Sequence, residues 1–165
     1  MKTLSAPIRS DDKVRLRGDL TVTMTNVRTG REVRHHVRNT ITYDGLNSSL
    51  YLWAQDSISV ADYRIVKLVP GLDATPPTRG DLSVVDPVAV GNQINLTSAN
   101  RALSAATGEL VITGTLGTTQ ANGLTLCEIG LVLGNGSLFA RQVHPNFTKT
   151  SAFTLTYTWR IAVTA

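Results

Sequence analysis

Residues 153–164 alternate between apolar and polar side chains more regularly than any other part of the chain. The apolar set is Phe153, Leu155, Tyr157, Trp159, Ile161 and Val163, and the polar set is Thr154, Thr156, Thr158 and Arg160. Successive side chains of a β-strand point to opposite faces, so this period of two predicts a strand with one buried face.

The same alternation predicts strands elsewhere in the chain. Residues 19–27 and 32–39 form a predicted hairpin whose turn contains Gly30. Further strands are expected in residues 61–69, 84–103 (one or two), 108–117 and 124–143 (two, joined by a type I′ turn at Asn135–Gly136). About eight short strands at this spacing predict an all-β fold, an antiparallel β-sandwich or a jelly-roll-like domain.

Two segments depart from the strand pattern. Residues 43–56 predict one short helix, capped by Asp44 and packed on one end or face of the sheets through Leu46, Leu50 and Trp53. Residues 70–81, "PGLDATPPTRGD", are rich in proline and glycine and predict a loop.

Charge divides the chain into two parts. Residues 1–18 are polar and basic without sustained periodicity, which predicts an extended N-terminal arm before a β-sandwich domain at residues 19–165. The net charge is +4, but only 17% of all residues are charged, which is low for a soluble domain. A weakly charged, threonine-rich surface favours contact with partner subunits, and a small symmetric homo-oligomer, preferably a trimer, is expected.

A single cysteine excludes an intrachain disulfide and a multi-cysteine zinc site. The N-terminus has no apolar signal core, and no apolar run is long enough to cross a membrane. Folding in a cytoplasm, without membrane association, is therefore expected.

The stretch "CEIGLVLGNGSLFARQVHP", residues 127–145, places a cysteine, a glutamate and a histidine close together in sequence. Strand alternation puts Cys127 on one face with Ile129, and Glu128 on the other with Leu126. Cys127 is therefore predicted to be a small buried side chain, and Glu128 a polar residue at a sheet edge or a subunit contact. His144 follows the next strand and is expected in solvent. A Cys127–His144 nucleophile remains the weaker alternative, and no catalytic residue is expected.

Neither metal nor cofactor binding is predicted. His35 and His36 are adjacent in a strand, so their rings point to opposite faces and cannot share a metal ion without distant ligands. The chain also lacks a phosphate-binding loop, a dinucleotide fingerprint and a GxSxG motif.

Basic residues of the arm and the first hairpin form the one candidate interaction site. They are Arg9, Lys13, Arg15, Arg17, Arg28, Arg31, Arg34, His36 and Arg38. They predict a solvated face or a docking surface for an acidic protein. Nucleic acid is the less favoured partner, because no aromatic residues lie between the basic residues of the hairpin to stack on bases.

Three pieces of the chain together resemble a group of tailed-bacteriophage virion proteins. "VRNTITYDGLNSSLYLWAQD" is similar to their strand-to-helix entry, and "YRIVKLVPGLDATPPTRGDLSV" to their strand followed by a loop rich in Gly, Thr, Pro and Asp. "LTLCEIGLVLGNGSLFARQVHPNFTKTSAFTLTYTWRIAV" resembles their C-terminal signature, in which "EIGL", "LFAR" and "KT" precede the strand "LTYTWRI".

This resemblance implies a non-enzymatic structural protein of the virion, assembled in the host cytoplasm. A capsid cement or decoration protein that binds the major capsid protein across neighbouring subunits is the favoured role. A tail, collar or fibre component, with possible receptor binding, is the alternative. The basic arm favours the cement role, because an arm that becomes ordered on binding covers a large area.

Overall fold

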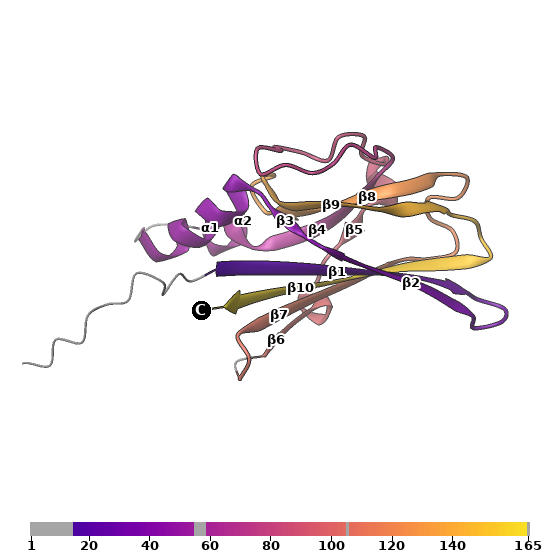
Figure 1. The fold of residues 1–165 in the computed structure, drawn as a ribbon, viewed down its shortest axis with the longest axis horizontal. Helices are drawn as coiled ribbons and strands as arrows, with labels where there is room; N and C mark the ends of the chain where they lie inside the picture. Colours follow the sequence, from indigo (N-terminus) through magenta and orange to yellow (C-terminus); the bar gives the residue numbers. More distant parts are fainter. Residues whose placement is uncertain (1–14, 55–58, 105, 165) are drawn as a thin grey trace, which may run out of the picture.

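The computed structural model describes residues 15–54, 59–104 and 106–164, which form two antiparallel sheets packed face to face (Figure 1). Sheet A has the strand order β2-β1-β10-β7-β6. Its strands are β1 (Arg15–Asn26), β2 (Glu32–Arg38), β6 (Arg101–Ser104), β7 (Glu109–Leu116) and β10 (Phe153–Thr164).

Sheet B has the order β3-β9-β8-β4-β5. Its strands are β3 (Thr40–Ile41), β4 (Ile65–Gly71), β5 (Ile94–Asn95), β8 (Thr125–Leu133) and β9 (Leu138–Thr148). The predicted all-β sandwich is therefore confirmed. The described residues form ten strands where about eight were predicted. β3 and β5 contain only two residues each, too few to show an alternating pattern.

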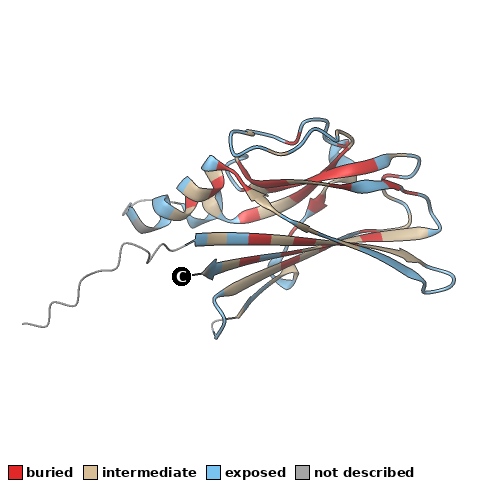
Figure 2. Ribbon diagram, in the orientation of Figure 1, coloured by how far each residue is buried: buried red, intermediate tan, exposed pale blue. Residues whose placement is uncertain are grey.

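The core fills the space between the sheets, as the buried segments in Figure 2 show. Leu155, Tyr157 and Trp159 of β10 are fully buried, and they belong to the same cluster as Leu68 and Leu131 of sheet B. The alternation of residues 153–164 is confirmed along most of its length. Val163 is an exception, since 53% of it is exposed at the end of the strand.

β1 pairs with β10 along its whole length, from Arg15 opposite Thr164 to Asn26 opposite Phe153. Because the strand begins at Arg15, residues 15–18 belong to the sheet and the predicted boundary of the arm at position 18 is wrong. The sequence did not reveal this part of the strand, because arginines occupy its exposed positions, Arg15 and Arg17, and resemble the basic residues of the arm. Residues 1–14 of the predicted arm lie outside the described residues.

Helix α1 (Tyr43–Ala54) confirms the predicted helix, but its cap differs from the prediction. The hydroxyl of Thr42, not Asp44, accepts a hydrogen bond from the backbone N–H of Gly45 at 3.0 Å. The same hydroxyl donates to backbone carbonyls of β9 at Leu138 and Phe139. The Thr42 hydroxyl therefore caps the helix and also binds it to sheet B.

The face of α1 that packs on the sandwich agrees with the prediction at Leu46, which packs against the core, but not at Leu50. Gly45 and Ser48 are buried, whereas Leu50 is 56% exposed. The side chain of Trp53 lies outside the described residues. α1 covers one end of the sandwich (Figure 1), and its small residues let the helix backbone approach β9 closely.

Three further short helices occur within the described residues: α2 (Val60–Tyr63), η1 (Val90–Asn92) and η2 (Ser98–Asn100). α2 replaces the first part of the strand predicted at residues 61–69, which begins only at Ile65. No helix in the described part of the chain is long and apolar enough to span a membrane.

The β8–β9 connection confirms the predicted hairpin but not its turn type. A type I′ turn needs positive φ at both central residues. Gly136 has φ +90°, but Asn135 is not among the residues with positive φ. The turn closes with the Gly136 N–H donating to the Leu133 carbonyl at 3.0 Å, and Leu133 N–H donating to the Ser137 carbonyl at 2.9 Å. This is a three-residue loop with a left-handed glycine.

We expect Gly45→Ala to destabilise the protein by about 1–3 kcal/mol, because overpacking shifts the surrounding backbone. A Cβ at position 45 would lie 2.1 Å from the carbonyl oxygen of Phe139. Gly91→Ala is the matched control, since a Cβ there meets nothing within 4 Å. Urea denaturation of both variants measures the difference, and equal midpoints would contradict the close packing of α1 on β9.

Candidate functional site

The loop between β4 and β5 lies across the outer face of sheet B (Figure 1, top). Val84 of this loop packs against Val69 and Leu138, which face away from the main core. Gly130 of β8 allows this approach, because a Cβ there would lie 2.5 Å from Val84 Cγ2. The loop therefore has its own small apolar contact with the sheet.

A buried ion pair joins β8 and β9 beneath this loop. Arg141 Nε donates to Glu128 Oε2 at 2.7 Å, and the two residues are 1% and 0% exposed. A buried charge is costly unless it is paired and hydrogen-bonded. The cost is offset here only while both partners are present.

The loop completes the hydrogen bonding of this pair. The carboxylate of Glu128 accepts backbone N–H bonds from Asp86 at 2.9 Å and from Asp73 and Val85 at 3.3 Å.

Arg141 in turn donates to Asp81 Oδ2 at 2.9 Å and to the Thr75 carbonyl at 3.0 Å, and it lies 3.7 Å from Asp73 Oδ1. The pair thus fixes a loop that has no regular backbone pairing of its own over most of its length.

The electrostatics of the network favour its charged forms. Burial opposes ionisation of Asp81, but hydrogen bonds from Thr78 and Arg141 outweigh it and lower the pKa of Asp81. The hydrogen bonds from Thr75 lower the pKa of Asp73, and Arg141 lowers it further. Burial alone would lower the pKa of Arg141, but Glu128 and Asp81 together raise it.

The prediction for Glu128 is wrong: it lies inside the fold, neither at a sheet edge nor at a subunit contact. The β8–β9 ladder shifts register between Leu126 and Glu128. Leu126 and Ile129 consequently both reach the main core, although strict alternation places them on opposite faces. A bulge of this kind re-aims side chains without leaving a clear mark in the sequence.

Cys127 and His144 lie in the same irregular stretch of the ladder. Cys127 is 3% exposed, which confirms the predicted buried cysteine, and His144 is also 3% exposed, so the expectation of a solvated histidine is wrong. Burial raises the pKa of the Cys127 thiol, and burial lowers the pKa of His144 from 6.5 to about 4. A thiolate–imidazolium nucleophile needs the opposite shifts.

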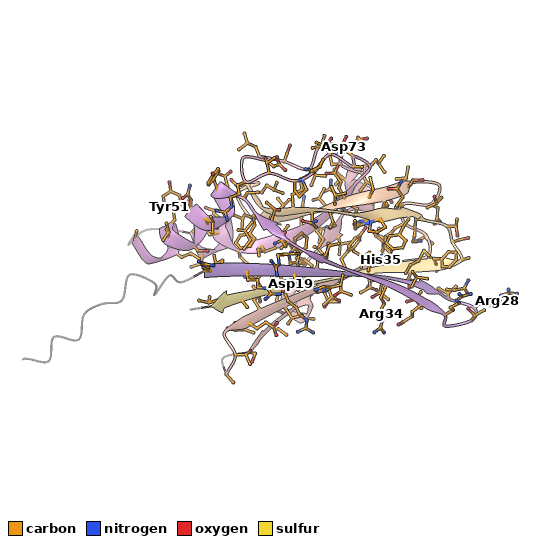
Figure 3. The ribbon with its side chains drawn as sticks, in the orientation of Figure 1. Asp19, Arg28, Arg34, His35, Tyr51 and Asp73 are labelled. Carbon is orange, nitrogen blue, oxygen red and sulfur yellow. The ribbon has the colours of Figure 1, made fainter. Side chains whose placement is uncertain are left out.

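The two neighbouring histidines point to different surroundings, as predicted. The rings of His35 and Phe147 meet edge to face, with their centroids 5.4 Å apart. Figure 3 shows His35 turned toward the interior. His36 is exposed and hydrogen-bonds Thr21 at 3.2 Å. Within residues 15–54, 59–104 and 106–164, no three His, Cys, Asp or Glu side chains come together to hold a metal ion.

The predicted basic site does not form one surface. Arg9 and Lys13 lie outside the described residues. Arg28 and Arg31 lie at the tip of the β1–β2 hairpin, and Arg34, opposite Thr23, lies partway along it (Figure 3). Arg15 and Arg17 lie at the other end of β1, about 30–40 Å from the tip, and Arg38, opposite Asp19, lies about 20–25 Å from it.

Neighbouring carboxylates offset the positive charge of several of these residues. Arg17 pairs with Asp19 at 3.0 Å, Arg34 pairs with Glu32, and His36 lies 3.8 Å from Asp19.

The arginines at the end away from the tip line an open hollow of about 810 Å³. Its charged lining comprises Arg15, Arg17, Arg38 and Arg79. Arg79 comes from the β4–β5 loop and was not predicted, because 41 positions separate it from Arg38 and only the fold brings them together. Leu16 also lines this hollow.

A second, apolar groove of about 320 Å³ adjoins the hollow at Leu16. It lies between α1 and the end of sheet A, and its walls include Leu52 of α1, Leu103 of β6 and Val163 of β10. These three side chains are 44%, 75% and 53% exposed. Tyr43 and Leu50 of α1, at the same end of the molecule, are also exposed, by 59% and 56%.

We call this region the apolar end. Its exposed members are Tyr43, Leu50, Tyr51, Leu52, Val60, Leu103 and Val163. Large apolar side chains exposed together at one end of a molecule favour a site of interaction with another molecule. Sequence reasoning missed it, because Leu50 and Val163 sit in apolar patterns that predict burial.

Sequence reasoning also missed the buried network and Lys149. Lys149 is 1% exposed, and its Nζ donates to the Thr150 carbonyl at 3.0 Å and to Asn122 Oδ1 at 3.3 Å. A signal was present for the pair, since Glu128 interrupts an otherwise apolar strand and Arg141 follows the apolar run Leu138–Ala140. A charge in such a position needs a buried partner.

Comparison with protein-family models, with curated proteins and with solved structures found no match to this chain.

Removal of Arg141 is expected to destabilise the protein by about 3–5 kcal/mol, because Glu128 is left charged and buried. Arg141→Met measures this loss by denaturant unfolding. In the double variant Glu128→Gln with Arg141→Met, the uncompensated charge is gone and stability should recover in part. A double variant no more stable than Arg141→Met alone would show that charge pairing is not what Arg141 provides.

Stability should fall in mild acid because of His144. The folded pKa of about 4 lies below the ordinary value of 6.5, so the unfolded chain binds the proton first. The contribution is complete above pH 6.5 and is lost as the pH falls toward 4, about 3 kcal/mol in all.

Urea unfolding of the wild type and of His144→Gln across this pH range isolates the effect. The wild type should lose more stability than the variant. Parallel curves would mean that His144 does not carry the pH dependence.

Proposed function

We propose that this chain is a non-enzymatic structural protein of a tailed-bacteriophage virion and that it acts as capsid cement. The observation that carries the proposal is the apolar end, where seven large side chains remain in solvent beside the start of β1. Surface of this kind favours a protein that works by assembly. The resemblance of the C-terminal signature supplies the virion context.

Three charged residues of that signature support a structural role. Glu128 of "EIGL", Arg141 of "LFAR" and Lys149 of "KT" are each at most 1% exposed. Their hydrogen bonds hold the β4–β5 loop and the β9–β10 connection in place. They are therefore satisfied inside the fold and are not available for a reaction with a substrate.

The outer surface of α1 is the part of the apolar end that we assign to contact with a virion partner, the major capsid protein in the cement role. Tyr43, Leu50 and Tyr51 are 59%, 56% and 43% exposed there. Aromatic residues combine large contact area with few rotatable bonds, which is why they concentrate in the centres of interfaces.

The test uses phage particles assembled without this chain, to which purified protein is added back. We expect the wild type to co-sediment with the particles and to raise the temperature at which they release DNA. Leu50→Asp should abolish both effects because it places a charge in the interface, whereas Val27→Asp, at the opposite hairpin tip, should not.

The outcomes separate the roles. Hundreds of copies on each particle fit cement, and about a dozen or fewer fit a tail, collar or fibre component. A wild-type protein that neither binds the particles nor stabilises them would overturn the proposal. Loss of binding by Val27→Asp alone would move the contact to the hairpin.

A further inference from the structure

We propose that the apolar groove between α1 and sheet A holds residues 1–14 of a second copy of this chain, so that copies assemble by exchanging N-terminal arms. The inference deepens the proposed assembly role and rests on it. It names the partner for one part of the apolar end.

The groove has the chemistry of a peptide site. Its apolar lining includes Leu16, Leu103, Leu110 and Ile161 of sheet A and Leu52 of α1. Leu103 is 75% exposed and Leu52 is 44% exposed, so the groove is open to an incoming chain. A segment with small and medium apolar side chains would cover surface that water otherwise meets.

The groove continues into the arginine hollow. Leu16 lines both, so an extended segment can pass from apolar walls to basic ones. Arg38 and Arg79 form no ion pair within the part of the chain that the structure describes. An occupant that is apolar first and acidic next would therefore complement the two surfaces in order.

Residues 1–14, "MKTLSAPIRSDDKV", place apolar side chains before two adjacent carboxylates, which lie between the cations Arg9 and Lys13. In an extended chain Leu4, Ala6 and Ile8 lie on one face, because alternate side chains point the same way. Asp11 and Asp12 follow about 10–14 Å further along. Their carboxylates are the natural partners of guanidinium groups, which bind them through two parallel hydrogen bonds.

The position of the arm makes a second copy reachable. β1 begins at Arg15, on the rim of the arginine hollow. Fourteen extended residues span up to about 50 Å, several times the radius of a domain of this size.

Sedimentation equilibrium of the full chain tests the proposal. The wild type should form an oligomer. The arm variant Leu4→Asp with Ile8→Asp should be monomeric, and so should the groove variant Leu103→Asp, whose side chain is exposed enough to change without disturbing the core. Val27→Asp, at the far hairpin tip, is the control and should keep the wild-type mass.

Mixing the two monomeric variants gives the decisive measurement. The groove variant retains an intact arm and the arm variant retains an intact groove, so an equimolar mixture should form a mixed dimer. Separate fluorescent labels on the two variants identify this species. Simple packing of apolar faces predicts no such recovery.

Several results would overturn arm exchange. One is a wild type that stays monomeric at about 100 µM, as expected if each arm occupies its own groove. Others are an arm variant that keeps the wild-type mass, or monomeric variants that form no mixed dimer. A monomer that still binds and stabilises particles would refute the exchange but not the virion role, and an arm-exchanged oligomer that ignores particles would refute the virion role.

Discussion

The buried pair of Glu128 and Arg141 determines how the outer face of sheet B can be covered. Two charges removed from water must satisfy nearly all of their hydrogen-bonding capacity, or the fold loses more than it gains. The strands alone cannot provide this, because their backbone groups are used in the sheet. The β4–β5 loop provides it, through three backbone N–H groups to Glu128 and through Asp81 and the Thr75 carbonyl to Arg141. A long irregular loop thereby becomes a fixed layer of the protein.

This layer has a consequence at the far edge of the loop. Arg79, held between the anchored positions Thr75 and Asp81, joins Arg15, Arg17 and Arg38 around one hollow. Glu128, Arg141 and Lys149 are internal and hydrogen-bonded, whereas the arginines around the hollow lie beside exposed apolar surface. Charge and apolar surface thus meet at this end of the molecule, and for that reason assembly is the role that we assign to it.

The chemistry that first draws attention in the sequence is absent from the folded geometry for a physical reason. Cys127 and His144 come close in the ladder, but the environment that buries them favours the neutral thiol and the neutral imidazole. Reactivity would require stabilised charges on both groups. The strand register that hides Glu128 also removes it from any role as a base. Alternation predicted burial for Cys127 alone, but Glu128 and His144 are buried as well. Burial therefore explains why none of the three residues is placed to react.

The sequence by itself determined the two-sheet sandwich, because alternation at residues 153–164 and in the first hairpin requires one buried face for each strand. It also located α1 and the first part of the long loop, since their composition excludes a continuous strand, but residues 84–93, where a strand was predicted, continue the loop up to β5 at Ile94. It did not determine the register shift at Leu126–Glu128, the capping of α1 by Thr42 or the exposure of Leu50, since each depends on which backbone lies opposite. Only the tertiary structure decided that Arg79 would join Arg15, Arg17 and Arg38 around one hollow. Contacts between residues far apart in the chain are set by packing, and local periodicity carries no information about them.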